Sequence, residues 1–465
     1  MDCLSLVRLR IGGTSFTSKG STNFFRHVWK NTGLQFFRVN MPPGPWVSKD
    51  PRVIVLLDGK SFPVLFDNSK VEKKNVFVGT YMPSTSFTGG IRVCSYLDPS
   101  EQKHHIFKSL LFSTLASRHK DIIPMFQEGL QGLFSEVEKQ VKETGRGDFN
   151  PPSDNLSLEI FFRIFCDDQK PTDTILGSDG PSIIKKWVIF QISPLQSLVE
   201  RGGLPKFLIP IEDLVLHSIG LPSFLVKGNY KKLYEVFSTS GKTFLDKAES
   251  EGMKREEAIH QLLFFASFNS SFGVSQWFPA LMYWIASAGE ILHRELAREI
   301  RSVVKSEGGV TMNAINKMVL TKSVILETFR IEPPVPYQYG RAKSDLVIQS
   351  HDAEFKVKKG EMIFGFQPFA TNDPKIFSDP DKFKGNRFVG EKGKELMKYV
   401  YWSNGKNIDD PTPDDKQCAG KNIVELLSAI MVAEFFLRYD TFTVDYEAGT
   451  KKLTIKSLKK ATSSG

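Results

Sequence analysis

Helical periodicity dominates the sequence from about Glu101 to Gly340, and this feature restricts the fold most. Apolar residues recur at helical spacing across residues 101–141, and residues 254–306 have the pattern of helices with charged outer faces. The chain has 465 residues, a length that by itself would indicate about three domains. However, no internal repeat, low-complexity segment or linker divides it. We therefore expect one large helical body.

Strand patterns flank this helical stretch. Residues 53–57 form an apolar run closed by Asp58-Gly59, which is typical of a strand followed by a turn. Between residues 345 and 365 the apolar period changes to two, which predicts a hairpin that turns at Lys359-Gly360. A final helix is expected at residues 421–438, followed by a strand-like tail. The predicted fold class is mainly α, an α+β chain with small β-sheets.

Phenylalanine is unusually frequent, with 38 Phe against 11 Tyr and 6 Trp. Bulky rings without a polar group predict an apolar interior and favour an apolar ligand pocket. The longest uncharged run, residues 262–289, contains Asn269, Gln276 and Pro279. These residues favour a buried helix over a membrane span.

The net charge of +9 comes from 61 Lys and Arg against 52 Asp and Glu. This excess is weaker than nucleic-acid binders show, so we expect no nucleic-acid partner. The densest basic stretch, residues 451–460, is interpreted as a solvated tail. A peripheral contact with an anionic membrane surface is the alternative. No feature of the sequence specifies an oligomeric state.

The chain has four cysteines: Cys3, Cys94, Cys166 and Cys418. They show no C-x-x-C pair and no disulfide-rich spacing, which favours a reducing compartment over secretion.

Cys418 has surroundings that suit a thiolate ligand. Lys416 and Lys421 flank it, and the helix expected from Lys421 would point its positive end at the sulfur, so we expect a lowered thiol pKa. Gly420 would let the backbone pass close to a flat macrocycle. A cysteine thiolate is one of the standard ligands of haem iron. The alternative is a free cysteine ahead of a surface helix.

A pair of opposite charges precedes this region. Glu327 and Arg330 are spaced to share one face of an apolar helix, and Arg387 offers the same glutamate a second guanidinium. An ordinary helical salt bridge is the alternative interpretation.

The order of these motifs resembles the cytochrome P-450 superfamily. An E-x-x-R sequence, a downstream N-R-F and a C-x-G loop follow one another along the chain. The resemblance implies a cytochrome P-450 fold in which Glu327, Arg330 and Arg387 form a buried triad. This triad would support a loop in which Cys418 binds the haem iron.

The loop itself is similar to one branch of the superfamily. Gly405 lies thirteen residues before Cys418 where the usual loop has four, so nine residues are inserted, and Lys416 replaces the usual arginine. The insertion and the sequence K-Q-C-A-G-K resemble the plant branch that metabolises fatty-acid hydroperoxides. Its members are allene oxide synthases, hydroperoxide lyases and divinyl ether synthases. Five segments look closest to allene oxide synthases: residues 40–44, 57–67, 79–84, 95–100 and 332–342.

This resemblance extends from about residue 24 to the C-terminus. It implies a single cytochrome P-450-like haem domain over residues 24–465, after an atypical N-terminal segment of residues 1–23. It also implies a plastid location, with the cytoplasm as the alternative.

The resemblance implies the reaction of an allene oxide synthase. A polyunsaturated fatty-acid hydroperoxide would become an allene oxide by haem-dependent O–O homolysis, in oxylipin and jasmonate biosynthesis. The cofactor would be haem b, without NADPH, reductase or molecular oxygen. The helix expected above the haem, residues 265–273, contains no acid, whereas monooxygenases carry an acid–alcohol pair there. Asn269 would stand over the iron as a neutral hydrogen-bonding group.

The resemblance also assigns the remaining site residues. Phe77 lies where allene oxide synthases carry an aromatic residue and lyases carry leucine, and its ring would stabilise an electron-poor carbon. Ser95 matches the synthase pattern as well. Lys73, His104 and Lys416 would pair with the haem propionates, since cations hold carboxylates.

One departure keeps rival products open. Synthases follow the asparagine with two residues and then Gly-Gly, whereas Phe272-Gly273 stands here. This raises a divinyl ether synthase or a hydroperoxide lyase as the first rival. A monooxygenase, or a non-catalytic haem-binding or lipid-binding protein, is less favoured. Both 9- and 13-hydroperoxides fit this interpretation.

Overall fold

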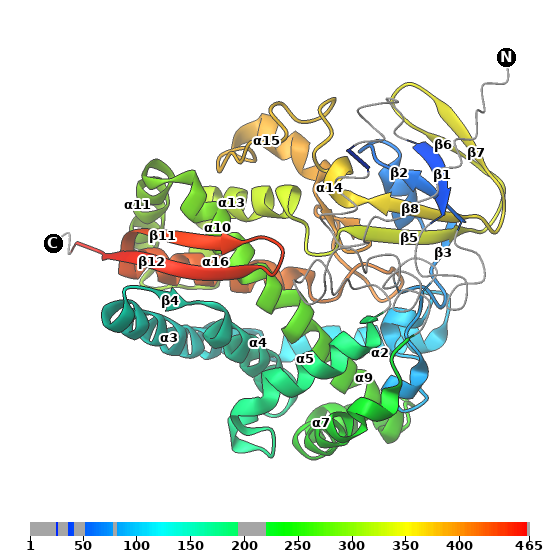
Figure 1. Cartoon of the computed structure of the whole chain (residues 1–465), viewed down its shortest axis with the longest axis horizontal. Helices are drawn as coiled ribbons and strands as arrows, with labels where there is room; N and C mark the ends of the chain where they lie inside the picture. Colours follow the sequence, from blue (N-terminus) through cyan, green and yellow to red (C-terminus); the bar gives the residue numbers. More distant parts are fainter. Residues whose placement is uncertain (1–24, 27–35, 41–51, 78–80, 194–219, 463–465) are drawn as a thin grey trace, which may run out of the picture.

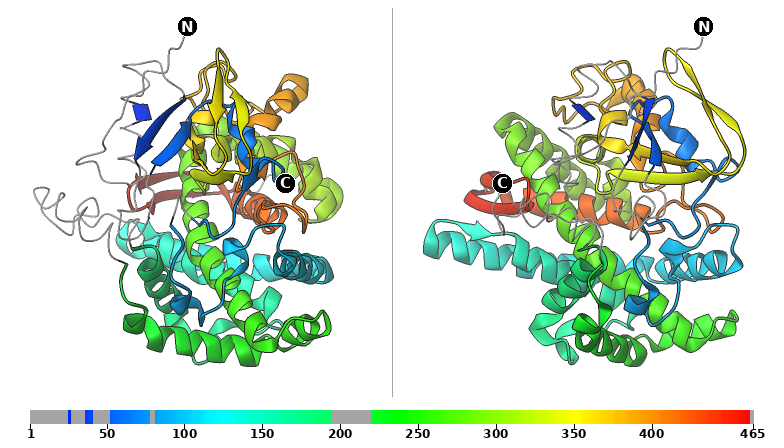
Figure 2. Two further views of the ribbon diagram at one scale, coloured as in Figure 1. Left: turned by 90° about the vertical axis from the view of Figure 1, so that its right-hand side faces the viewer. Right: turned by 45° about the vertical axis from the view of Figure 1, so that its right-hand side comes forward.

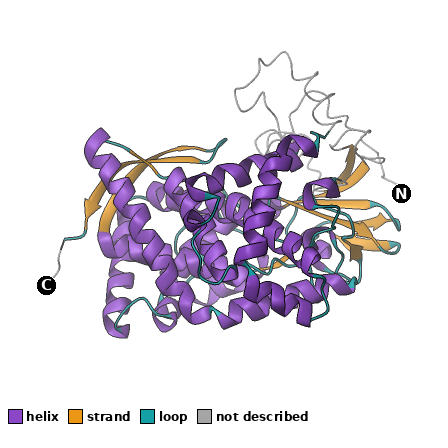
Figure 3. Cartoon of the chain, turned by 90° about the horizontal axis from the view of Figure 1, so that it is seen from below, coloured by secondary structure: helices purple, strands orange, loops and turns teal. Residues whose placement is uncertain are grey.

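The computed structural model describes residues 25–26, 36–40, 52–77, 81–193 and 220–462. The predicted N-terminal segment 1–23 lies outside these residues, and so do most of residues 40–44. Within them, Figure 1 shows a large body of helices with a sheet packed on one side. Figure 3 shows the strands gathered at two ends of the helical body. The prediction of a mainly helical α+β fold is confirmed.

Helices make up most of the described chain. They are α2 (Gln102–Ser117), α3 (His119–Thr144), α4 (Asn150–Phe165), α5 (Gly180–Gln191), α7 (Lys227–Ser240), α8 (Lys242–Ser250), α9 (Arg255–Phe268), α10 (Ser275–Ala288), α11 (Glu290–Glu307), α12 (Met312–Lys317), α13 (Val319–Ile331), α14 (Gln367–Ala370), α15 (Gly390–Leu396) and α16 (Lys421–Arg438). The final helix was expected at residues 421–438, and α16 confirms it.

The strands are β1 (Phe36–Asn40), β2 (Arg52–Leu56), β3 (Val71–Glu72), β4 (Gly147–Asp148), β5 (Tyr337–Ala342), β6 (Leu346–Gln349), β7 (Glu354–Val357), β8 (Met362–Phe366), β9 (Tyr401–Trp402), β10 (Gly405–Lys406), β11 (Tyr439–Glu447) and β12 (Lys452–Lys460). Five of them form a sheet in the order β1-β2-β8-β5-β3. β2 and β8 pair in parallel, with Val53 opposite Met362, although they are far apart in the sequence. β11 and β12 form the strand-like tail that the sequence predicts.

The hairpin predicted at Lys359-Gly360 is wrong in its pairing. The chain does turn there, and Gly360 has φ +86°, which favours glycine. However, β7 pairs with β6, while β8 pairs with β2 and β5. The turn therefore carries the chain from a two-stranded ribbon into the five-stranded sheet.

One long helical path runs through the middle of the molecule, drawn in green in Figure 2. It consists of α9, a π-helical turn η9 (Asn269–Val274) and α10. This path covers the uncharged run that the sequence assigns to a buried helix, and residues such as Leu262 and Leu281 are fully buried. Among the described residues, none of the helices is both long enough and apolar enough to cross a bilayer.

The main hydrophobic core lies between this path and α16. Ile430, Met431, Val432 and Ala433 are consecutive and fully buried, so α16 is enclosed on all sides. Smaller apolar clusters cover the two faces of the five-stranded sheet. The candidate site lies between the five-stranded sheet and α16.

Candidate functional site

Cys418 lies at the N-terminal end of α16, in the loop that follows the β9–β10 hairpin. Its backbone N–H donates to Ser403 O at 3.1 Å, and its carbonyl accepts from Lys421 N at 3.2 Å. These bonds fix the sulfur between the hairpin and the start of the helix.

The loop before Cys418, where the nine-residue insertion is predicted, is anchored on α2. Lys108 Nζ donates to the carbonyl of Asp415 at 2.7 Å and to its carboxylate at 2.8 Å. His104 Nδ1 donates to Pro413 O at 3.1 Å. His104 and Lys108 are four residues apart on α2 and therefore share one face. The insertion thus joins α2 to the loop that holds the sulfur.

Burial raises the pKa of the Cys418 thiol, although the Gly420 amide, the Trp402 indole and Lys108 oppose this effect. The sequence predicts the opposite direction, because Lys416 and Lys421 flank the cysteine. Lys421 instead lies 3.8 Å from Asp410 and 3.9 Å from Glu425. The protein groups alone therefore do not hold the sulfur as a thiolate. Binding to a cation such as iron deprotonates a thiol.

The Cys418 side chain lines a cavity of about 500 Å³. The cavity walls come from residues that are distant in the sequence, including α2, the α9–η9–α10 path and the loop before β5. Every residue that the sequence assigned to the catalytic or cofactor-binding groups lines this cavity: Lys73, Phe77, Ser95, His104, Asn269, Lys416 and Cys418. The triad residues do not line it.

Asn269 is the first residue of η9 and faces this cavity. Its Nδ2 donates to Phe265 O at 2.7 Å, one turn earlier on the helix. Because this bond uses the amide nitrogen, the amide oxygen is oriented as the acceptor. η9 itself contains no ionisable residue.

Aromatic rings line the cavity beside Asn269. Phe77 makes edge-to-face contacts with Tyr96, Phe264 and Phe268, with ring centroids 5.6, 6.4 and 5.4 Å away. Phe272 stacks on Phe268 at 5.7 Å. The Phe272 ring thus forms part of the cavity wall.

Cationic side chains occupy another wall. Lys416 Nζ donates to the carbonyl oxygens of Cys94, Ser95 and Leu97. Burial lowers the pKa of Lys416 to about 8. Burial and the nearby Lys416 lower the pKa of His104 to about 3, so the imidazole is neutral at physiological pH. The Lys73 ammonium donates to Asn404 Oδ1.

Lys73 is destabilising to the protein without cofactor. Burial, with a smaller effect of Lys416, lowers its pKa from 10.5 to about 7. Between pH 7 and pH 10.5 the unfolded chain therefore holds a proton on Lys73 that the folded chain lacks. The free energy of unfolding rises with pH across this window, and the penalty of the buried charge is largest below pH 7.

Lys73→Met should therefore stabilise the haem-free protein at pH 6 by about 1–3 kcal/mol, because it removes a desolvated charge. If Lys73 pairs with a haem propionate, as expected from the sequence, the same change should also weaken haem retention. Thermal unfolding of haem-free protein and the rate of haem release measure the two effects. Lys103→Met is the control, since Lys103 is exposed and pairs with Glu257. A variant that is no more stable than its parent at pH 6 would contradict the argument.

Glu327, Arg330 and Arg387 meet in the interior away from the cavity. Arg330 donates to both carboxylate oxygens of Glu327 at 2.7 and 2.9 Å. Arg387 Nε lies 2.9 and 2.8 Å from the same two oxygens. The Glu327 and Arg330 side chains are fully buried. Two cations thus share one buried anion, and their other donors are satisfied by backbone carbonyls of residues 371–382.

The triad is connected to the Cys418 loop through aromatic packing. Phe329, on the same helix as Glu327, lies edge-to-face against Trp402 at 4.5 Å and stacks on Trp277 at 3.9 Å. Trp402 belongs to β9, directly before the Ser403 carbonyl that binds the Cys418 amide. A shift of α13 would therefore move the wall behind the sulfur.

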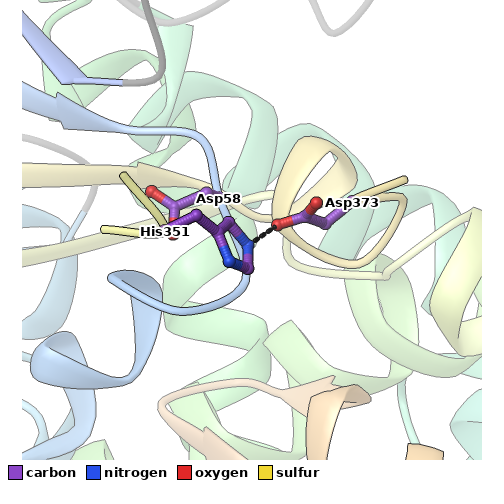
Figure 4. Close-up of side chains that lie close together, drawn as sticks. All are labelled: Asp58, His351 and Asp373. Carbon is purple, nitrogen blue, oxygen red and sulfur yellow. Dashed lines mark hydrogen bonds and ion pairs between the residues drawn. The ribbon is translucent and has the colours of Figure 1, made fainter. Parts of the chain in front are cut away.

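Figure 4 shows a second cluster, in which Asp58, His351 and Asp373 lie close together. The imidazole Nε2 donates to Asp373 Oδ2 at 2.7 Å, and Gly59 N donates to the same oxygen at 2.9 Å. Asp58 accepts from the amide and the hydroxyl of Ser61 at 2.8 and 2.6 Å. Because these donors already use the carboxylate oxygens, we interpret the cluster as a cross-link. It joins the turn after β2, the β6–β7 turn and the loop after α14.

Sequence reasoning missed several residues of the site. Lys108 lines the cavity and anchors the insertion, and its spacing of four from His104 was the signal that could have found it. Gln261 accepts from Cys94 N at 2.7 Å and donates to Arg92 O at 3.1 Å, which ties α9 to the segment containing Ser95. Nothing in the local sequence of Gln261 indicates this contact.

The chemistry of the cavity walls fits a haem. The sulfur provides a single soft axial ligand. The walls are largely apolar, which suits a macrocycle. On one side Lys73, whose ammonium has one bond, to Asn404, suits a carboxylate, whereas the three donors of Lys416 are taken by backbone carbonyls. The Ser95 hydroxyl is buried and has no hydrogen-bond partner among the described residues, which leaves a donor for a bound group.

Three features together define the class of protein. A thiol lies at the start of a buried helix, a long helix with a π turn lines the same cavity, and a buried Glu-Arg-Arg triad packs behind the thiol loop. This combination is that of a cytochrome P450. Residues 233–458 match the cytochrome P450 family. The chain is 48% identical to allene oxide synthase 3 of Solanum lycopersicum, over 96% of this chain and 90% of the relative. It is 49% identical to the chloroplastic allene oxide synthase of Arabidopsis thaliana, over 96% of this chain and 85% of the relative. The chain therefore belongs to the allene oxide synthase family of the cytochrome P450s. This family membership implies a haem iron held by a cysteine thiolate.

Proposed function

We propose that this protein is an allene oxide synthase, a haem-thiolate hydro-lyase that converts a polyunsaturated fatty-acid hydroperoxide into an allene oxide. The proposal is carried by one observation: Cys418, the neutral Asn269 and Phe77 all line the same cavity. Relatives named allene oxide synthase, at 48–50% identity over 96% of the chain, support it. The allene oxide product is proposed to enter oxylipin and jasmonate synthesis.

The cofactor is proposed to be haem b, which would supply an iron centre for homolysis of the O–O bond. Cys418 is assigned as the axial ligand. Lys73, Lys416 and His104 are assigned to the propionate side. His104 is neutral with its Nδ1 hydrogen engaged, so we assign it to holding the Pro413 loop in place beside the two lysines. Glu327, Arg330 and Arg387 are assigned to supporting the Cys418 loop.

Asn269 orients the hydroperoxide. Its amide nitrogen is held by Phe265 O, so its oxygen is available to accept from the O–H of the substrate. This bond would hold the substrate in one orientation without supplying a proton. η9 contains no acid to deliver protons to dioxygen, which suits a substrate that already carries its oxygens as a hydroperoxide, and we therefore propose turnover without NADPH or a reductase. A monooxygenase would need both.

Phe77 and Ser95 are proposed to steer the carbon skeleton after the O–O bond breaks. Formation of an allene oxide passes through an electron-poor carbon that loses a proton. The Phe77 ring is held by three edge-to-face contacts, so its π-face is kept in a fixed position. A fixed π-face attracts positive charge. The Ser95 hydroxyl, which lacks a protein partner, can contact the substrate oxygens.

Residues 24–465 are proposed to form one haem domain. Several relatives are named chloroplastic, which supports a plastid location for this protein. Besides the substrate, we propose one further partner. This is a membrane surface, which the basic strand β12 would contact peripherally.

Product analysis tests the proposed function. Purified protein loaded with haem is mixed with the 9- and the 13-hydroperoxide of linolenic acid, without NADPH or reductase. We expect loss of the hydroperoxide and formation of ketols and a cyclopentenone, which are the decay products of an allene oxide. A divinyl ether or a volatile aldehyde would instead identify one of the two rival enzymes. An unchanged substrate would support a non-catalytic protein.

Phe77→Leu should redirect the product. Loss of the π-face should disfavour the electron-poor carbon by about 1 kcal/mol, or roughly a fivefold change in the product ratio toward carbon–carbon scission. Chromatography of the aldehydes and ketols measures this ratio. Phe107→Leu is the matched control, because Phe107 also lines the cavity but has no assigned contact with the reacting carbons. Equal ratios in both variants would remove Phe77 from this role.

A further inference from the structure

Gln261 is a polar residue in a largely apolar wall of the cavity. It lies on α9, is 1% exposed, and lines the cavity together with Phe265 and Asn269. These three residues are spaced by four along one helical path, so they share one face. The amide nitrogen of Asn269 also donates to Phe265 O. A movement of this helix face therefore carries Gln261 and Asn269 together.

Both ends of the Gln261 amide are bound to the backbone of another segment. Cys94 N donates to Gln261 Oε1 at 2.7 Å, and Gln261 Nε2 donates to Arg92 O at 3.1 Å. Cys94 is the first residue of the short helical turn η3 (Cys94–Tyr96), whose own N-cap residue provides no side-chain hydrogen bond. The first N–H groups of a helix have no partner within it. Gln261 thus caps η3 from a different helix.

The turn η3 carries Ser95, whose hydroxyl is buried and has no hydrogen-bond partner among the residues that the structure describes. The backbone of η3 is also held by Lys416 Nζ, which donates to Cys94 O at 2.9 Å and to Ser95 O at 3.0 Å. Lys416 belongs to the loop that precedes Cys418. The position of Ser95 is therefore determined by contacts with both α9 and this loop.

We propose that Gln261 is a positioning residue for this reaction: by capping η3 from α9, it sets the separation between the Asn269 amide and the Ser95 hydroxyl. These are the two groups assigned to the substrate oxygens, and they stand on different elements. A link between the elements keeps both groups in place for one hydroperoxide. The effect on turnover rests on the proposed function. The cap does not, because it concerns hydrogen bonds within the protein.

Hydrogen exchange of the Cys94 amide tests the cap, in haem-loaded protein without substrate. Gln261→Met keeps nearly the same side-chain length and removes both bonds. Protection at Cys94 should therefore fall about fivefold, the effect of one lost hydrogen bond. Gln261→Glu keeps an acceptor for Cys94 N in either protonation state, so this variant should keep the protection.

A double-mutant cycle tests whether Gln261 acts through Ser95. The rate measured is the loss of hydroperoxide per bound haem, which an allene oxide synthase and both rival enzymes share. Gln261→Met should lower kcat about tenfold, because a small misplacement of a contacting group is costly. Ser95→Ala should lower kcat by at least as much.

In the Ser95→Ala background, Gln261→Met should lower kcat by less than about twofold, because the separation of the two groups no longer matters. A merely structural role of Gln261 would lower kcat by the same factor in both backgrounds.

Gln338→Met is the matched control. Gln338 is also buried, also lines the cavity and also bonds at both ends of its amide. It accepts from Asn404 N at 3.2 Å and donates to Gln367 Oε1 at 3.3 Å, so its bonds lie outside η3. Protection at Cys94 should stay at the parent value in this variant. Any effect on kcat should be the same with and without the Ser95 hydroxyl.

Unchanged protection at Cys94 in Gln261→Met, or equal losses of kcat in the two backgrounds, would overturn the inference. A haem-loaded parent that does not consume hydroperoxide would instead overturn the proposed function, and with it the role of Gln261 in turnover. The exchange experiment would then still decide whether Gln261 caps η3.

Discussion

Cys418→Ala is expected to abolish turnover of the hydroperoxide, by about 1000-fold or more, the scale on which loss of the group that organises the chemistry acts. Without the sulfur, the haem would lack its protein ligand at the N-terminus of α16. The reduced protein should then lose the red-shifted absorbance of its carbon monoxide complex, which marks a thiolate ligand. Absorbance spectra and hydroperoxide decay measure the two effects.

This loss should occur without unfolding. The two bonds that fix residue 418, to Ser403 and Lys421, involve only its backbone. The haem-free variant should therefore unfold within about 1 kcal/mol of the parent. Cys166→Ala is the control, because Cys166 is a fully buried thiol at the end of α4 and is absent from the cavity lining. A Cys418→Ala protein that retains the thiolate spectrum would show that another residue binds the iron.

Glu327→Gln should have the largest effect on folding. It leaves the Arg330 and Arg387 guanidinium groups buried without an anion, and such a loss costs about 3–5 kcal/mol. The two arginines also satisfy carbonyls between α14 and α15, so this loop should loosen first. Denaturant unfolding of the variant, or its soluble yield if it does not accumulate, measures the effect.

Glu128→Gln is the matched control. Glu128 also pairs with two cations, Arg163 and Lys170, but its side chain is 53% exposed. Its loss should cost less than about 1 kcal/mol. Arg387→Lys should fall between the two, because it keeps the charge but loses the planar fork. Equal costs for the two glutamates would show that burial of the triad contributes nothing to stability.

Helices were predictable where a single periodic signal determines them. α16 begins at Lys421 and ends at Arg438 as expected, because an apolar run without breakers follows Gly420. The strands at residues 354–357 and 362–366 were also predictable, but their partners were not. Alternation specifies which face of a strand is buried, whereas pairing of β8 with β2 depends on contacts more than 300 residues apart along the chain.

The site was predictable as a set of residues rather than as an electrostatic environment. Phe77, Asn269 and Cys418, which were selected from sequence motifs, line one cavity. The sequence neighbours of Cys418 suggested a lowered thiol pKa, but burial outweighs them. Proximity along the chain does not determine where a lysine head group lies: Lys421 turns to Asp410 and Glu425.

The π turn was beyond sequence reasoning. The run 269–274 has an ordinary helical pattern, and nothing in it indicates a change in pitch. Only the three-dimensional structure shows the π turn and its contacts with α4 and α5.

The parallel pairing of β2 with β8 also restricts when the molecule can assemble during synthesis. Strand β2 and the cavity residues Lys73 and Phe77 leave the ribosome early, but their neighbours β8 and Cys418 follow only after most of the chain has been made. Contacts of such sequence separation form slowly, since a long loop must close first. Strand β2 must therefore wait, with its apolar side chains exposed, until β8 has been made. Haem capture by Cys418 is accordingly expected late, after most of the chain has been made.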